Sequence, residues 1–228
     1  MRVSITIFSV FLAGCGTLNT ARPLAPNEHR MGITGGGVVL TQLGPPIPLP
    51  NMVIEGQSGF KAIGNHNWDI NYGLNATALA FGTIGTHLGS SILLKEANGL
   101  RPALSMTERM HFYNNWLDST KAKEVRKGYL LNEIELTASW NLNQHLGYVG
   151  MANYTDTADP EMTLAPFIGT QININQPWYQ NGFLQLEMRY LAINRQPDIV
   201  DVSFLGGNYG ALSVTGSIGK SFGKGVQQ

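Results

Sequence analysis

Histidine and serine side chains are the first candidates in this sequence for catalysis or metal binding. The five histidines stand far apart, at His29, His66, His87, His111 and His145. None has a metal-ligand spacing from another histidine or from the single cysteine, so the sequence predicts no zinc site. His87 precedes Ser91 by four residues. An even spacing on a β-strand places two side chains on one face, where they could act as base and nucleophile.

Two further segments could hold a charged ligand, but each lacks the pattern that such a site needs. No Lys-Ser or Lys-Thr pair and no helix signal follows the glycine run 35–37, so it does not form a phosphate loop. The run predicts close strand packing or curvature instead. Asp156, Asp159 and Glu161 lack the periodicity of a calcium loop, and we expect a solvated acidic turn there.

These residues must be positioned by β-strands, because most of the chain from Arg30 onward alternates between apolar and polar residues. In 128–142 the even positions are mainly apolar and the odd positions mainly polar, which predicts a strand with one apolar face. The ten segments that fit this pattern are 30–42, 51–63, 67–80, 84–95, 100–112, 128–142, 145–155, 161–174, 182–192 and 209–222. An even number of long strands, with 114–126 as the one convincing interruption, predicts an all-β, antiparallel up-and-down β-barrel.

The connections between the predicted strands differ in length in a regular way. The three longest, 43–50, 113–127 and 194–208, are all odd-numbered along the chain, so they lie at one end of an up-and-down barrel. This asymmetry resembles that of bacterial outer-membrane barrels, which have short periplasmic turns and longer outward loops. The resemblance implies that both ends of the barrel chain lie on the periplasmic side.

The polar faces of the predicted strands indicate which side of the barrel faces outward. They are rich in Asn, Ser, Thr, Gln and Gly and carry nearly balanced charges, whereas a water-facing exterior is rich in Lys and Glu. We therefore expect the polar faces to line a narrow lumen, where opposite charges pair and obstruct ions. The predicted lumen charge cluster comprises Asp69, Arg101, Arg109, Glu133, Glu135, Glu187 and Arg189.

Two charges and several aromatic residues lie on or near the apolar faces. Glu108 and Lys220 are expected close to a rim, because a charge at the membrane midplane costs about 2–4 kcal/mol. Aromatic residues gather near strand ends, which is typical of the interfacial girdles of a membrane barrel, with ordinary cross-strand packing as the alternative. They are Phe81, Phe112, Tyr113, Tyr129, Tyr154 and Tyr209 near the long connections, and Trp68, Trp140, Trp178 and Tyr179 at the other end.

The first fifteen residues have the layout of a secretory signal. Arg2 supplies one positive charge, an apolar run extends from Val3 to Phe11, and Leu-Ala-Gly-Cys ends the segment at Cys15. A buried N-terminal strand or helix with an ordinary core cysteine is the alternative interpretation. The segment resembles the lipobox of bacterial lipoproteins, in which the chain is cut before the cysteine and the thiol receives a diacylglyceryl group.

This resemblance implies an organisation for the whole chain. Residues 1–14 are expected to be the signal peptide, 15–28 the lipidated cysteine and a tether, 29–223 the barrel and 224–228 a tail. The partners that it implies are membrane lipid, the lipoprotein-processing machinery and the barrel-assembly machinery. Gly16 stands where an aspartate would favour the inner membrane, so the resemblance points to the outer membrane.

Composition narrows the function further. The chain has 15 basic and 15 acidic residues among 228, and only 13% of it is charged, which disfavours a nucleic-acid binder with a basic face. No cofactor, metal or small-molecule substrate is predicted. We predict a lipid-anchored outer-membrane barrel of structural, surface-exposed or narrow-pore type, without catalysis.

Two alternatives stay open at this point. The first is a soluble, lipocalin-like lipoprotein that binds an apolar ligand inside its barrel, and the direction of the apolar faces distinguishes it from a membrane barrel. The second is an outer-membrane lipid hydrolase. Those families carry a His-x-Ser-Asn run, which this sequence lacks around His87.

Overall fold

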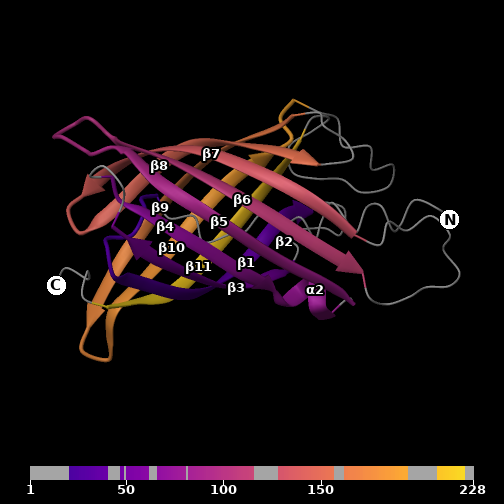
Figure 1. The fold of residues 1–228 in the computed structure, drawn as a ribbon, viewed down its shortest axis with the longest axis horizontal. Helices are drawn as coiled ribbons and strands as arrows, with labels where there is room; N and C mark the ends of the chain where they lie inside the picture. Colours follow the sequence, from indigo (N-terminus) through magenta and orange to yellow (C-terminus); the bar gives the residue numbers. More distant parts are fainter. Residues whose placement is uncertain are drawn as a thin grey trace, which may run out of the picture.

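A closed barrel of ten long antiparallel strands contains most of the residues that the computed structural model describes (Figure 1). The structure describes residues 21–40, 47–48, 50–61, 66–80, 82–115, 128–156, 162–194 and 210–223. The long strands are β1 (Glu28–Leu40), β3 (Asn51–Phe60), β4 (Trp68–Asn75), β5 (Thr83–Lys95), β6 (Ala103–Asn115), β7 (Gly128–Leu142), β8 (His145–Asp156), β9 (Thr163–Gln176), β10 (Tyr179–Leu191) and β11 (Ala211–Gly223). A two-residue strand, β2 (Ile47–Pro48), and a short helix, α2 (Ala76–Ala80), complete the described elements.

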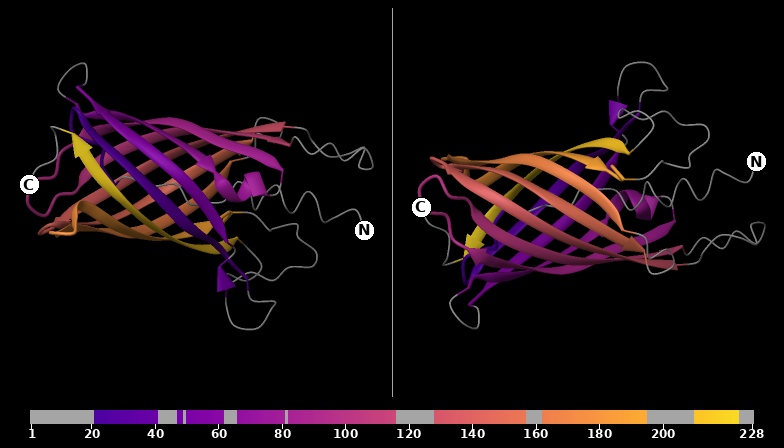
Figure 2. Two further views of the ribbon diagram at one scale, coloured as in Figure 1. Left: turned by 90° about the horizontal axis from the view of Figure 1, so that it is seen from below. Right: turned by 90° about the horizontal axis from the view of Figure 1, so that it is seen from above.

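Each long strand pairs with its neighbours along the chain, and the first and last strands pair with each other. The closing β1–β11 ladder runs in register from Glu28 opposite Gly223 to Val38 opposite Ser213. Closure removes the free sheet edges that would otherwise invite pairing with another chain. The two views of Figure 2 show the tilted strands on both sides of the barrel. The predicted antiparallel up-and-down barrel of about ten strands is therefore confirmed.

One predicted strand is shorter than expected. The alternation over 67–80 predicts a strand to Ala80, but β4 ends at Asn75 and residues 76–80 form α2. The amide of Ala78 donates to Oδ1 of Asn75 at 2.8 Å, which is the geometry of an N-cap. Alanine is also the best helix former, so the alanines that continued the alternation favour a helical turn instead.

The two ends of the barrel differ in the connections they carry. Tight turns follow β7 and β9, at 143–144 and 177–178, and they lie at the end where β1 begins and β11 ends. We call this end the short-turn rim and the opposite end the long-loop rim. β1, β6 and β10, the strands that precede the three long connections, all end at the long-loop rim, as predicted (Figure 1).

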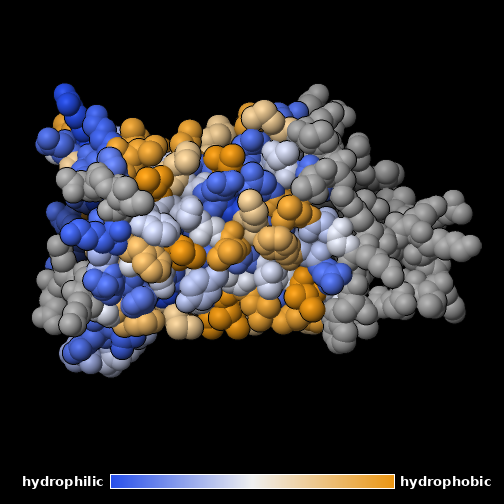
Figure 3. Space-filling view, viewed as in Figure 1, coloured by the Kyte–Doolittle hydropathy of each residue, from blue (hydrophilic) through white to orange (hydrophobic). Residues whose placement is uncertain are grey.

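The apolar faces of the strands point outward and the polar faces point into the barrel. On β7, Leu136 is 55% exposed, whereas its neighbours Glu135 and Thr137 are 0% and 3% exposed. Other exposed apolar side chains on the strands include Met31, Ile33, Leu88, Met110, Ile168, Leu186, Met188 and Ile218. Figure 3 shows the resulting hydrophobic band on one side of the molecule. The prediction that polar faces line the lumen is confirmed.

The two outward charges occupy different heights. Lys220 lies three residues before the end of β11, close to the short-turn rim, as expected. Glu108 lies near the middle of β6, so the expectation that it lies close to a rim is wrong. The predicted strand 100–112 placed Glu108 four residues from its end, but β6 begins and ends three residues later.

The aromatic residues do not all belong to outward girdles. Phe112 is 46% exposed on the outer face, and Trp178 is 81% exposed in the turn before β10. Tyr113 and Tyr154 instead are buried on inward-facing positions, at 6% and 8% exposure. Phe81 and Tyr209 lie outside the described residues. In the described part of the chain, no helix is both long and apolar enough to cross a membrane.

Candidate functional site

A network of five buried charged side chains fills part of the lumen, and we call it the lumen ion network. β6 contributes Arg109, β7 contributes Glu133 and Glu135, and β10 contributes Glu187 and Arg189. The residues on one strand are two apart and therefore share its inward face. All five are at most 5% exposed. Arg109 and Glu133 also lie directly opposite each other in the β6–β7 ladder.

The two arginines of the lumen ion network join three strands by ion pairs. Arg109 Nη1 lies 3.2 Å from Glu133 Oε2 and 3.1 Å from Glu135 Oε2. Arg189 reaches from β10 to β7, with Nη1 2.7 Å from Glu133 Oε1 and Nη2 2.5 Å from Glu135 Oε1. Its Nη2 also lies 2.9 Å from Glu187 Oε1. Because β7 and β10 are not neighbours in the sheet, these contacts cross the lumen.

Neutral groups beside the lumen ion network supply further contacts to Glu187 and Arg189. Tyr148 donates to Glu187 Oε2 at 3.1 Å and accepts a 2.6 Å hydrogen bond from Gln185 Nε2. Arg189 donates to the Tyr154 hydroxyl, and its guanidinium lies 4.6 Å from the centre of the Phe167 ring. A buried charge is less costly when it is paired and hydrogen-bonded, so these contacts stabilise Glu187 and Arg189 in the lumen. Arg109 Nε and Glu135 Oε2 have no hydrogen-bond partner among the described residues.

A second group closes the lumen nearer the short-turn rim, and it comes from the chain before β1. Residues 21–27, which we call the N-terminal segment, lie inside the barrel, with Ala21 and Leu24 only 1% and 2% exposed. The amide of Leu24 donates to Asp69 Oδ2 at 2.8 Å, and Ser105 Oγ donates to the Ala21 carbonyl at 3.2 Å. The second half of the predicted tether is therefore bound to the inner wall.

Arg22 holds the N-terminal segment to β7, the next strand beyond β6. Its Nε donates to Ser139 Oγ at 2.9 Å, and its Nη1 donates to Asn141 Oδ1 at 2.7 Å. Partial burial lowers the pKa of the Arg22 guanidinium from its ordinary value, but an arginine remains protonated. Both partners belong to the end of β7 at the short-turn rim.

The seven charges predicted to cluster in the lumen thus fall into three places. Five of them form the lumen ion network, while Asp69 accepts hydrogen bonds from Leu24 and, at 2.6 Å, from Gln57 Nε2. Arg101 is exposed in the connection between β5 and β6, where it bridges to Asn98, so its assignment to the lumen was wrong. The predicted strand began before Arg101, whereas β6 begins two residues after it. Cys15 lies outside the described residues.

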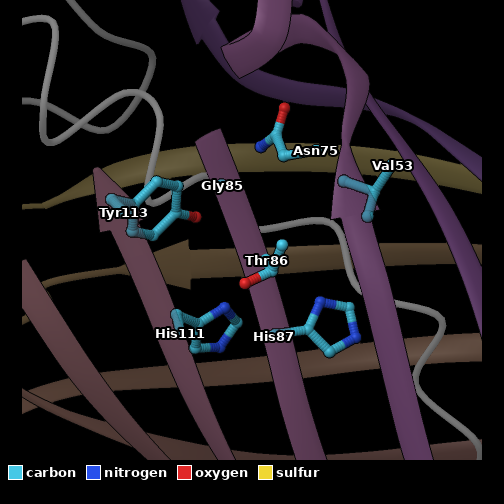
Figure 4. Close-up of a pocket in the computed structure, with 7 residues that line it drawn as sticks. All are labelled: Val53, Asn75, Gly85, Thr86, His87, His111 and Tyr113. Atoms are coloured by element: carbon cyan, nitrogen blue, oxygen red, sulfur yellow. The ribbon is translucent and has the colours of Figure 1, made fainter. Parts of the chain in front are cut away.

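A small cavity lies beside two histidines toward the long-loop rim (Figure 4). It is lined by Val53, Asn75, Gly85, Thr86, His87, His111 and Tyr113. The two imidazole rings lie 5.5 Å apart between centres, and His111 Nε2 lies 2.9 Å from Glu133 Oε2. The cavity has room for about one water molecule, so an organic ligand does not fit. Among the described residues, no three His, Cys, Asp or Glu side chains are grouped to hold a metal.

His87 and Ser91 share the inward face of β5 but do not contact each other. Four strand residues separate their Cα atoms by about 13 Å. Ser91 Oγ instead accepts from Thr107 Oγ1 at 2.9 Å. His87 packs over Gly73, where an added Cβ would lie 2.3 Å from the imidazole Cε1. At this separation His87 cannot take a proton from Ser91, so the two residues do not form a base and nucleophile pair.

The glycine run at the end of β1 packs closely against its neighbour strand, as predicted. Gly36 has a φ of +118°, and an added Cβ would lie 2.3 Å from the carbonyl oxygen of Val214. Both the dihedral and the contact require glycine at this position. Of the acidic group at 156–161, only Asp156 lies within the described residues.

Comparison with known proteins does not assign this barrel to a family. No protein-family model and no curated protein matches the chain. The placement of the residues is therefore the basis for a functional assignment.

The contacts of the N-terminal segment with Asp69, Ser105 and Ser139 were not predicted from the sequence. The segment has no apolar periodicity, so its sequence carries no signal for where it lies.

Proposed function

We propose that this chain is a lipid-anchored barrel embedded in the bacterial outer membrane, with a closed lumen and a structural or surface-exposed role without catalysis. The observation that carries the proposal is the inverted distribution of side chains. Large apolar side chains such as Leu88, Leu136 and Ile168 are 55% to 58% exposed. The charged side chains of Arg109, Glu133 and Glu135 are instead fully buried. A largely apolar exterior is an aggregation hazard in water but suits contact with lipid.

Strand length supports the same environment. β5, β6, β10 and β11 each have 13 residues, and β7 has 15. A tilted strand needs roughly 9–11 residues to cross the hydrocarbon core, so each of these strands is long enough.

The interior argues against a lipocalin-like carrier of apolar ligands. Such a carrier needs an apolar cavity, and the lumen here contains ion pairs, amides, hydroxyls and the N-terminal segment. The same contents favour a closed barrel over an open pore, because ten strands enclose a space that side chains can largely fill.

The anchor and orientation complete the proposal. Cys15 carries the lipid, and the barrel inserts with its short-turn rim toward the periplasm and the connections 113–127 and 194–208 toward the outside. The asymmetry of the two rims supports this orientation. Protease added to intact cells should then cut within the long connections and spare the turn at 143–144, whereas the reverse pattern would mean inverted insertion.

The decisive experiment separates an embedded barrel from a tethered one. A secretory signal without a lipobox replaces residues 1–15, so that the exported chain has no lipid. An embedded barrel stays in the outer membrane and resists extraction with alkaline carbonate. A lipocalin-like protein is released into the periplasm, which would overturn the proposal. Mass spectrometry of the natural chain tests the anchor, because lipidation requires loss of residues 1–14 and gain of a diacylglyceryl group, and an intact Met1 contradicts it.

A further inference from the structure

A polar patch interrupts the outward apolar surface on the side of the barrel formed by β5 to β8. Figure 3 shows hydrophilic residues in the middle of the hydrophobic band, over the strands labelled β6 and β7 in Figure 1. The patch consists of Ser90, Glu108, Asn132 and Asn153, and we call it the belt patch. Ser90 lies opposite Glu108 in the β5–β6 ladder. Ile134 connects Glu108 to Asn153, because it lies opposite both residues. Asn132 lies opposite Met110, the next outward residue of β6 after Glu108.

Glu108 is the centre of the belt patch. It is exposed near the middle of β6, and the outward residues on either side, Met106 and Met110, are apolar and exposed. The Glu108 side chain makes no ion pair or hydrogen bond with any other residue that the structure describes. A carboxylate at this height is unfavourable against lipid tails, so the position calls for a partner that supplies hydrogen-bond donors.

The two asparagines beside it are also incompletely satisfied. Among the described residues, the side-chain oxygens of Asn132 and Asn153 are closed off and have no hydrogen-bond partner. Each asparagine side chain carries two N–H donors and an acceptor, whereas an ionised glutamate only accepts. The belt patch therefore combines an acceptor and donors that complement each other.

We infer that the belt patch is the interface between two copies of this chain, which form a dimer through β6 and β7. The inference rests on the proposed insertion in the membrane. Two copies in one membrane are related by a two-fold axis along the membrane normal, so the belt patch of one copy faces the belt patch of the other. In such a pair the Glu108 carboxylate of each copy accepts a hydrogen bond from the Asn132 amide of the other.

The second outward charge does not offer a better partner for Glu108. Lys220 lies on β11, five strands away around a barrel of ten, and close to the short-turn rim. A head-to-tail contact between the two charges would join residues at different heights. The exposed Met106, Met110 and Leu136 around the patch instead supply the apolar border that a two-fold interface needs.

Cysteine cross-linking in isolated outer membranes tests the dimer. The version in which residues 1–15 are replaced contains no other cysteine, so a single Met110→Cys substitution reports on one position. Met110 lies directly opposite Asn132 and is 44% exposed, so this variant keeps both Glu108 and Asn132. Oxidation should yield a disulfide-linked product of twice the chain mass. Ile218→Cys is the matched control, because Ile218 is 52% exposed on the outer face of β11, away from the patch. It should give no such product.

A second variant tests the role of the carboxylate. Adding Glu108→Leu to Met110→Cys should lower the yield of cross-linked dimer by about tenfold or more, because the symmetric dimer loses both of its hydrogen bonds to a charged group. Lys220→Leu, added in the same way, should leave the yield unchanged. An unchanged yield with Glu108→Leu would overturn the assignment of Glu108.

The outcomes separate this inference from the proposed function. If the barrel resists carbonate extraction but Met110→Cys gives no dimer, the inference is overturned and membrane insertion stands. If the barrel is released by carbonate, the proposed function itself fails. A cross-linked product of any other mass would mean that a different protein covers the belt patch, which also overturns the pairing of two copies.

Discussion

The lumen is closed at two regions, and the two closures are built from different parts of the chain. The lumen ion network consists of side chains on the strands themselves, so it forms whenever the barrel closes. The N-terminal segment is a separate stretch of chain, held mainly by hydrogen bonds to Asp69, Ser105 and Ser139. The first closure is part of the wall, whereas the second can be removed from the chain without cutting a strand.

The energetic consequences of the two closures differ for the same reason. Removing one partner of a buried ion pair leaves an uncompensated charge and costs about 3–5 kcal/mol. Removing a neutral hydrogen-bond partner costs about 1–3 kcal/mol when the remaining group stays buried. The network should therefore dominate stability, and the N-terminal segment should chiefly affect access to the lumen.

The largest effect is expected from Arg189→Ala. It removes the cation that contacts Glu133, Glu135 and Glu187, and Arg109 alone cannot pair with all three carboxylates. The free energy of unfolding should fall by about 3–5 kcal/mol, measured by urea denaturation in detergent micelles. Arg101→Ala removes an exposed arginine and should change it by less than about 0.5 kcal/mol. Equal effects of the two variants would show that the network does not hold the barrel together.

Conduction in planar bilayers distinguishes the two closures directly. The wild type should carry little or no stable current. Replacing Arg109 and Arg189 by alanine, or deleting residues up to Pro26, removes one closure and should raise the current modestly. The combination should give the largest current, because no obstruction by either region remains. A large steady current through the wild type would refute both closures, and an equal current in all four proteins would show that neither controls access.

Loss of the hydrogen bond between the N-terminal segment and β4 should have an intermediate effect on the free energy of unfolding. Asp69→Ala removes the acceptor of the Leu24 amide and of Gln57 Nε2, which should lower the free energy of unfolding by about 1–3 kcal/mol. It should also expose the segment. A cysteine at position 24 should react faster with a maleimide in the Asp69→Ala background than with Asp69 present. Identical labelling rates would mean that Asp69 does not retain the segment.

The alternation of residues predicted the barrel well because each strand has one buried and one exposed face. On β7, the odd positions Glu133 and Glu135 and the even position Leu136 fell on the expected sides. Alternation holds no information on where a strand starts, which is why Glu108 and Arg101 were misplaced by a shift of three residues in β6. Local capping was missed at Asn75 for a similar reason, since the alanines after it fit both a strand and a helix.

The candidate site was less predictable than the fold. Sequence spacing placed Arg109, Glu133 and Glu135 on inward faces, but which charges meet depends on the closure of the sheet and on pairs that cross the lumen, such as Arg189 with Glu135. Asp69 instead accepts hydrogen bonds from the Leu24 amide of the N-terminal segment and from Gln57. Neither long-range contact leaves a periodic trace in the sequence.

The smallest effect is expected where the N-terminal segment meets β7. Ser139→Ala removes the hydroxyl that accepts from Arg22 Nε, but Arg22 keeps its hydrogen bond to Asn141 and its contact with the Ser139 carbonyl oxygen, 3.2 Å from Nη2. Because Arg22 is only partly buried, water can replace the lost acceptor. The free energy of unfolding should fall by only about 0.5–1 kcal/mol, and maleimide labelling at position 24 should stay close to the wild-type rate. A labelling rate as fast as with Asp69→Ala would show instead that Arg22, and not the hydrogen bond to β4, holds the segment in the lumen.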